Sequence, residues 1–168
     1  YGPGPVRKWE RSTPAHSTLE IDGKNSSEVW ANFRVARRAY PLDVSLKCKE
    51  DAVIVEAAHD GYRRLPGRPI HRRRWMLSSR SLEVSDFLEG RYSSAVARVH
   101  FHPDIKLKQD LGVCGAARWR DHTIDWQVDA KTVAIKPSHW SPEFGLQREN
   151  VCLEANASKG RATFSLRW

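Results

Sequence analysis

The chain has 168 residues, of which 40% are hydrophobic and 10% aromatic, with 7 Trp, so it can build a packed core and is not a disordered chain. Lys and Arg total 28 against 20 Asp and Glu, giving a formal net charge of +8. A field of this sign attracts nucleic acid, anionic lipid or acidic polysaccharide, and the charge alone does not choose among them.

Several classes of protein are excluded by what the sequence lacks. No stretch approaches the ~18 apolar residues of a membrane-spanning helix, so no membrane span is expected. Cys48, Cys114 and Cys152 lie far apart and form no CxxC pair, which excludes a zinc knuckle. One disulfide or three reduced thiols both remain open.

The first forty residues contain loop and turn signals. The Gly- and Pro-rich start, residues 1–8, predicts a loop. Asn25-Ser26-Ser27-Glu28 is typical of a helix N-cap followed by Glu three residues later. We therefore expect a short helix or turn near residues 26–33.

From residue 42 onward, apolar and polar residues alternate with period two. The clearest runs are 42–48, 124–128 and 162–168, and the weaker ones are 53–57, 82–85, 95–101, 132–136 and 151–155. Because successive side chains of a strand point to opposite faces, each run has one apolar and one polar face. We predict an all-β fold, an antiparallel β-sandwich of stacked sheets with about ten to twelve strands and at most one short helix. We expect residues 1–168 to form a single β-sheet domain.

Residues 71–74, His-Arg-Arg-Arg, are the densest basic run. On a strand, Arg72 and Arg74 share one face, whereas His71 and Arg73 share the other. Guanidinium groups bind sulfate, carboxylate and phosphate through two oxygens at once, so Arg72 and Arg74 are candidate anion-binding residues. The same run also fits an edge strand that charge protects from aggregation.

Histidines offer two further candidate sites. His100 and His102 could supply two metal ligands from one strand face, or could simply be polar residues before a Pro103-Asp104 turn. His16 lies in a Ser- and Thr-rich loop, where a single imidazole is usually hydrogen-bonded and inert. We find no GxSxG, P-loop, HExxH or dinucleotide-binding motif, and therefore predict no catalytic residues in this chain. Nucleic-acid-reading motifs are lacking as well, so no nucleic-acid partner is expected.

Several sequence blocks between residues 1 and 105 resemble the heparinase II/III-like polysaccharide lyases. The resembling blocks are Tyr1-Gly-Pro-Gly, Arg11-Ser12-Thr13, Ala15-His16, Asp22-Gly23, Ser26-Ser27-Glu28-Val29-Trp30, Phe33-Arg34-Val35-Ala36-Arg37-Arg38-Ala39, His59-Asp60-Gly61-Tyr62, Leu65-Pro66-Gly67, His71-Arg72-Arg73, Asp86, Gly90 and His100-Phe101-His102-Pro103. The resemblance implies the C-terminal β-sheet domain of a longer lyase, whose N-terminal helical toroid is not part of this chain.

This resemblance also implies an activity, namely cleavage of acidic polysaccharides by β-elimination. The toroid would supply the catalytic Tyr, and this domain would form one wall of the substrate cleft, so the chain alone is expected to be inactive. Tyr1, Arg7 and Arg11 would face the toroid and contact the anionic polysaccharide. A periplasmic or secreted location is implied as well. The alternatives are a non-catalytic module that binds anionic glycans and a purely structural domain.

His16 resembles the third protein ligand of a structural zinc in the family. That zinc site would be complete only in the intact parent protein, because other ligands belong to an upstream block. Ser17 replaces the usual Asn after this histidine, and Pro14 stiffens the loop, so the presentation of His16 is expected to differ from the family pattern.

Overall fold

The computed structural model describes residues 4–30, 33–143, 145–157 and 159–168. Its elements are α1 (Pro5–Glu10), the 3-10 turn η1 (Thr13–Ala15), β1 (Leu19–Ile21), β2 (Val29–Trp30), β3 (Arg34–Val35), β4 (Pro41–Cys48), β5 (Ala52–His59), β6 (Ile70–Ser78), β7 (Ser81–Glu89), β8 (Ala95–His100), β9 (Lys106–Leu111), β10 (Cys114–Trp119), β11 (His122–Asp129), β12 (Thr132–Glu143), β13 (Leu146–Asn156) and β14 (Arg161–Arg167). The predicted all-β fold is confirmed. Fourteen strands occur among the described residues, two more than the upper limit of the ten to twelve expected. Two of the fourteen, β2 and β3, have only two residues each.

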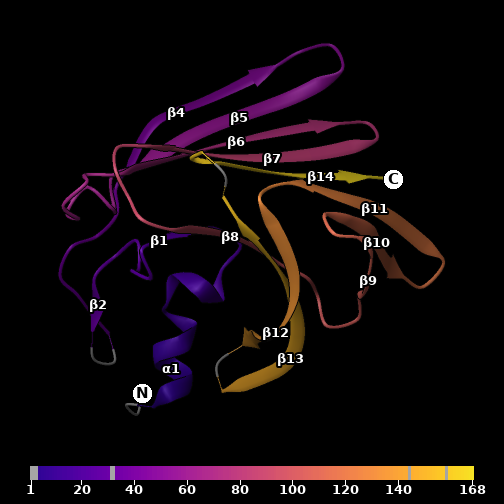
Figure 1. Ribbon diagram of the computed structural model, residues 1–168. Helices are drawn as coiled ribbons and strands as arrows, with labels where there is room; N and C mark the ends of the chain where they lie inside the picture. The colour runs from indigo at the N-terminus through magenta and orange to yellow at the C-terminus, as the bar shows by residue number, and fades with distance from the viewer. Residues whose placement is uncertain (1–3, 31–32, 144, 158) are drawn as a thin grey trace.

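Two antiparallel sheets form the body of the molecule (Figure 1). The larger has eight strands in the order β4-β5-β6-β7-β14-β11-β10-β9, and the smaller has four in the order β1-β8-β13-β12. In Figure 1 the strands β4 to β7 and β14 lie above β8, β13 and β12, while α1 lies beside the lower end of β12 and β13. The predicted stacked-sheet architecture is therefore confirmed.

The core lies between the sheets, where the alternation places apolar side chains. Phe164 on β14 is the cross-strand neighbour of Val128 on β11 and of Val84 on β7. Phe164 and Val128 belong to the same buried cluster as Leu153 of the smaller sheet, together with Trp126. Fully burying one such side chain stabilises the fold by about 1.5–3 kcal/mol. The strands predicted at 124–128 and 162–168 thus have their apolar faces inward, except at Trp168, which follows the end of β14 and is exposed.

The strand predicted at 42–48 exists as β4, but its apolar side chains are not covered. Val44 is 67% exposed and Leu46 is 66% exposed, because β4 is the outermost strand of the larger sheet. Asp43 has a φ of 51° within an irregularity in the pairing with β5, which shifts the alternation there. A sequence pattern identifies a strand and its two faces, whereas coverage depends on where the strand lies in the sheet.

Of the helix or turn expected near residues 26–33, no helix occurs in the described part, whereas bends at Ser26 and Ser27 and a turn at Phe33 fit the second alternative. Val29–Trp30 and Arg34–Val35 pair as the hairpin strands β2 and β3, whereas residues 31–32 are not described. The helix of the structure is α1, which begins at Pro5 within the stretch 1–8 that was expected to be a loop and ends at Glu10. Pro5 explains the difference, because its φ is already helical and its missing N–H is not needed in the first turn.

Cys48, Cys114 and Cys152 are all free thiols, so the open question of pairing is answered in favour of reduced cysteines. Burial raises the pKa of the Cys152 thiol to about 12, which makes it an inert core side chain. Among the described residues there is no helix long and apolar enough to cross a membrane.

Candidate functional site

Residues 13–18, which include His16, form a turn held by side chains that are distant in sequence; we call it the His16 turn. The Thr13 N–H donates to Asn25 Oδ1 over 2.8 Å, and the Ser26 N–H donates to Thr13 Oγ1 over 2.8 Å. Just after the turn, the buried Tyr62 hydroxyl donates to the Leu19 carbonyl over 2.8 Å. Backbone groups that would otherwise lack partners are therefore paired by side chains on other segments.

A buried ion pair of the larger sheet, Arg73 with Asp86, also contacts the His16 turn. Arg73 on β6 and Asp86 on β7 are direct cross-strand partners, and Asp86 is fully buried. Arg73 Nε donates to Asp86 Oδ1 over 2.7 Å and Nη2 donates to Oδ2 over 2.9 Å, while Nη1 reaches the Ser17 carbonyl at 2.5 Å. Burial alone raises the pKa of the Asp86 carboxyl, but the bonds from His71 and Arg73 outweigh it and lower that pKa below its usual range. One guanidinium thus joins the larger sheet to the turn next to His16.

Two histidines extend this network, and their tautomers follow from their partners. The Gly61 N–H can only donate, and it lies 3.2 Å from His59 Nδ1, so Nδ1 accepts. His59 Nε2 then carries the hydrogen and donates to His71 Nδ1 over 3.0 Å, and His71 Nε2 donates to Asp86 Oδ1 over 2.6 Å. Burial, with repulsion from His71 second, lowers the pKa of His59 to about 4. His59 is consequently neutral, and these hydrogen bonds orient both imidazole rings.

His100 and His102 do not form a pair. His100 Nε2 lies 2.9 Å from the Pro14 carbonyl, which can only accept, and the His100 N–H donates to Ser17 Oγ over 3.0 Å. His102 lies beyond the end of β8, and its ring packs edge-on against Trp140 at 4.7 Å between centroids. Burial lowers the pKa of His100, so this imidazole is neutral at pH 7. His100 therefore helps to hold the His16 turn in place through its contacts with Pro14 and Ser17.

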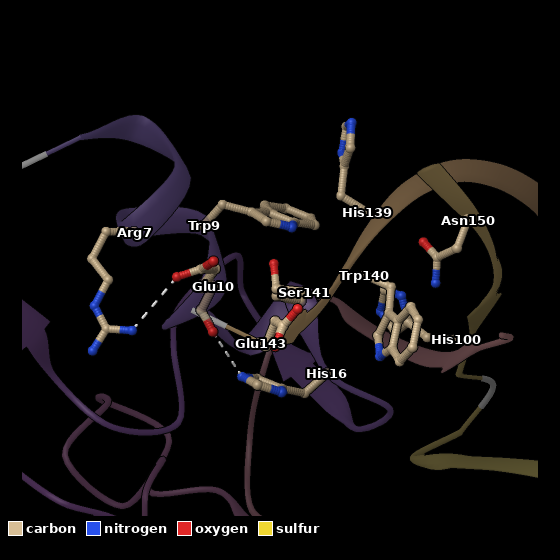
Figure 2. Close-up of a pocket in the computed structure, with 11 residues that line it drawn as sticks. Arg7, Trp9, Glu10, His16, His100, His139, Trp140, Ser141, Glu143 and Asn150 are labelled. Carbon is tan, nitrogen blue, oxygen red and sulfur yellow. Dashed lines mark hydrogen bonds and ion pairs between the residues drawn. The ribbon is translucent and has the colours of Figure 1, made fainter. Parts of the chain in front are cut away.

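A cavity of about 450 Å³ opens between α1 and strands β12 and β13, within the size range of small-molecule sites. Its lining comprises Arg7, Trp9, Glu10, Ala15, His16, His100, His139, Trp140, Ser141, Glu143 and Asn150. Figure 2 shows Arg7, Trp9 and Glu10 coming from α1, with His139, Trp140 and Asn150 coming from the facing strands. Arg7 and Glu10 form an ion pair of 3.5 Å, and His16 Nε2 lies 3.0 Å from the Glu10 carbonyl. We call this cavity the tryptophan pocket.

A second cavity of about 530 Å³ lies on the other side of Glu10 and His16, which line both cavities. Its remaining lining residues are Arg11, Thr13, Thr18, Ser26, Ser27, Val29, Val35, Arg38 and Ala39. We call it the arginine pocket. The two cavities therefore adjoin at Glu10 and His16.

The whole chain, residues 1–168, matches the family model described as "Heparinase II/III-like, C-terminal". The chain belongs to this family. It is a heparinase II/III-like C-terminal domain, in agreement with the resemblance found in its first 105 residues, and the match extends that resemblance to the C-terminus. No match was found among curated proteins.

Solved structures of heparinases share the fold of this domain. A heparinase III aligns with a TM-score of 0.78 at 15% sequence identity, over 99% of this chain and 26% of the other. A heparan sulfate lyase, HepC from Pedobacter heparinus, aligns with a TM-score of 0.77 at 15% identity, again over 99% and 26%. The chain therefore spans about a quarter of the length of these proteins.

Three of the residues predicted from the family resemblance line these two cavities. Arg7 lines the tryptophan pocket, Arg11 lines the arginine pocket and donates to the Arg34 carbonyl over 3.1 Å, and His16 lines both pockets. Tyr1 lies outside the described residues. Sequence reasoning missed Trp9, Trp140 and Asn150, since nothing in their local pattern shows that a helix and two strands would bring them together.

Arg72 and Arg74 lie elsewhere in this heparinase II/III-like domain, on the face of β6 opposite to Arg73. Arg72 pairs with Asp43 at 2.9 Å and with Glu89 at 3.7 Å, and Arg74 lies 3.7 Å from Glu56. Both are partly exposed. Neighbouring carboxylates already neutralise much of their charge.

The described residues do not by themselves fit the structural zinc that the family resemblance implies. His16 is exposed and its Nδ1 has a lone pair available, because Nε2 faces a carbonyl. A structural zinc site needs four ligands, and no group of three or more His, Cys, Asp or Glu able to hold a metal occurs in the described part of the chain.

Proposed function

We propose that this chain forms one wall of the substrate cleft in a lyase that cleaves acidic polysaccharides by β-elimination. The observation that supports this proposal is the pair of adjoining cavities at His16, one lined by Arg7 and the other by Arg11 and Arg38. Two adjoining cavities that both carry cationic side chains suit an extended polyanion. The solved relatives named above are a heparinase III and a heparan sulfate lyase, which makes an acidic polysaccharide the first substrate to test.

In β-elimination, a base removes the proton beside the sugar carboxylate and an acid protonates the departing oxygen. Neutralising the carboxylate stabilises the enolate-like intermediate, which is the large electrostatic contribution to such reactions. We propose that the acid and the base belong to the helical toroid outside this chain. The contribution of this chain is to bind and orient the polymer through Arg7 and Arg11. A periplasmic or secreted location is part of the same proposal.

The proposal is tested with the complete protein that contains this chain, incubated with heparan sulfate and with alginate. Elimination leaves an unsaturated uronate, whose ultraviolet absorbance reports cleavage. We expect cleavage of at least one polymer, and a lower kcat/KM in the Arg7→Ala and Arg11→Ala variants. If neither polymer is cleaved while both bind with an affinity that falls with salt, the chain belongs to a non-catalytic glycan-binding protein instead.

A further inference from the structure

The core-facing side of the larger sheet carries two rows of apolar side chains, each crossing six neighbouring strands from β11 to β4. Direct cross-strand partners lie on the same face of a sheet, so the pairing register links each row residue by residue. The first row is Val128, Phe164, Val84, Trp75, Val55 and Leu46, and the second is Trp126, Leu166, Leu82, Leu77, Val53 and Cys48. We call these residues the apolar rows.

The apolar rows are buried at their β11 end and uncovered toward β4. Val128 is 1% exposed and Trp126 is 2% exposed, whereas Leu77 on β6 is 47% exposed and Leu46 on β4 is 66% exposed. The difference follows from the sizes of the two sheets, because the smaller one has four strands against eight and faces only part of the larger one (Figure 1). The end of the apolar rows on β4, β5 and β6 is therefore a continuation of the core that the described residues leave open to solvent.

The opposite face of these strands is polar, as expected of a sheet surface in contact with water. One row on that face consists of Ser45, Glu56, Arg74, Ser85, Thr163 and Asp129, and the next consists of Lys47, Ile54, Met76, Glu83, Ser165 and Gln127. In these two rows only Ile54 and Met76 are apolar, whereas every member of the apolar rows is apolar. A contiguous apolar surface that stays exposed marks a site of contact.

The outer edge of β4 is protected against pairing with a further strand, so the contact site is the face of the sheet rather than its edge. β4 begins with Pro41, its pairing with β5 is irregular around Asp43, and its Lys47 is exposed. Proline, backbone irregularities and lysine are features that keep an edge strand from recruiting another strand. The face of the sheet at the apolar rows has no such protection.

A cavity of about 220 Å³ opens between the two sheets where the apolar rows pass from covered to uncovered. Most of its lining is apolar, with Trp75, Leu82 and Val84 on the larger sheet and Val99 and Leu153 on the smaller one. An apolar side chain suits this cavity, because a polar group placed among these residues would lose its hydrogen bonds to water.

We propose that a further segment of the same polypeptide, outside residues 1–168, covers the open end of the apolar rows and places an apolar side chain in this cavity. The heparinase III named above shares the fold over 99% of this chain, yet that region is only 26% of its own length, so proteins with this domain hold enough additional chain to do so. A second copy of this chain is disfavoured, because two domains with a formal net charge of +8 repel one another. No residue of the apolar rows lines the two cavities at His16, so the inference does not depend on lyase activity.

The test measures how fast a maleimide labels individual thiols in the native complete protein, with peptide mass spectrometry locating the label. Two thiols report on the open end of the apolar rows: the native Cys48, which is exposed in this domain, and the thiol introduced by Leu77→Cys. Lys47→Cys, made together with Cys48→Ser, is the matched control, because Lys47 is an exposed neighbour on the opposite face of the same strand. We expect both reporters to react at least about tenfold more slowly than the control, and all three thiols to react at similar rates in urea.

Similar rates for the reporters and the control in the native protein would overturn the inference, since the face would then be open to solvent. Protection of the reporters that disappears when the protein is diluted from dimer to monomer would assign the face to a second copy and would overturn the proposed occupant. If Leu77→Cys misfolds, Cys48 decides the question, because it needs no substitution within the apolar rows. The labelling is done without glycan, so a failure of the lyase proposal would leave this inference standing.

Discussion

His59 Nε2 donates a hydrogen bond of 3.0 Å to His71 Nδ1. His59 Nδ1 already accepts from the Gly61 N–H, and His71 Nε2 already donates to Asp86. A second proton on His59 would therefore meet the Gly61 N–H. This chain of bonds makes the stability of the domain depend on pH.

We predict that the domain loses stability as the pH falls from about 6.5 to about 4. Burial first and repulsion from His71 second lower the pKa of His59 from 6.5 to about 4. Between these values the unfolded chain binds a proton that the folded chain does not, so acid favours unfolding. The full contribution, on the order of 3 kcal/mol, is present above pH 6.5. Urea unfolding at several pH values measures it, and a His59→Gln variant with an equally steep pH dependence would contradict it.

Removing the Asp86 carboxylate should be among the most damaging polar substitutions. Asp86→Asn leaves the Arg73 guanidinium buried without a counter-charge, for an expected loss of about 3–5 kcal/mol in the free energy of unfolding. Chemical denaturation gives this value. Glu154→Gln is the control: Glu154 pairs with Arg98 at 2.8 Å, but Arg98 keeps Glu20 at 2.8 Å and the loss should be about 1 kcal/mol or less. Equal losses in the two variants would count against a special role of the Asp86 pair.

Gly61→Ala should destabilise the domain by overpacking the site beside Ser26. A Cβ at residue 61 would collide with the Ser26 carbonyl oxygen and with the Ala39 side chain. We expect a loss of about 1–3 kcal/mol, as for other overpacked sites, together with a lower melting temperature. Gly4→Ala is the matched control, because none of the described residues lies within 4 Å of a Cβ built there. A melting temperature of Gly61→Ala within about 1 °C of the control would refute this prediction.

The two pairs of arginines should differ in their effect on glycan binding. Arg7→Ala with Arg11→Ala and Arg72→Ala with Arg74→Ala each remove two positive charges, so their effects on net charge are equal. We expect the first double variant to elute from a heparin column at clearly lower salt than the second. The reason is that Arg7 and Arg11 line the two cavities at His16, whereas Arg72 and Arg74 lie on the face of β6 opposite to Arg73, beside Asp43, Glu89 and Glu56. The reverse order of elution would place the glycan on the outer face of β6.

We propose that His16 is one of the zinc ligands of the complete protein, which should then retain zinc through gel filtration and lose zinc content in the His16→Ala variant. Elemental analysis of the purified protein provides the measurement. His16 is exposed, so this substitution should leave the melting temperature of the metal-free protein unchanged. Zinc retained in full by His16→Ala would show that the metal, if bound, uses other ligands.

By itself, the sequence determined the class of the fold and the faces of the strands. Alternation at 124–128 and 162–168 depends only on the two-residue repeat of an extended backbone, so it can be seen in any single segment. The family resemblance also indicated Arg7, Arg11 and His16, each of which lines at least one of the two cavities. No helix forms in the described part of residues 26–33, because Asn25 and Ser26, which suit a helix cap, instead make hydrogen bonds with Thr13.

Only the tertiary structure decided which side chains meet. Arg73 and Ser17 are 56 residues apart and become partners through the pairing of β6 with β7 and the turn after α1. Trp9 and Asn150 line one pocket because α1 lies against β12 and β13, a placement that no local pattern encodes. The exposure of Val44 and Leu46 likewise depends on β4 being an edge strand. Periodicity is a property of one segment, whereas burial, ion pairing and pocket geometry arise from contacts between segments that only the folded chain brings together.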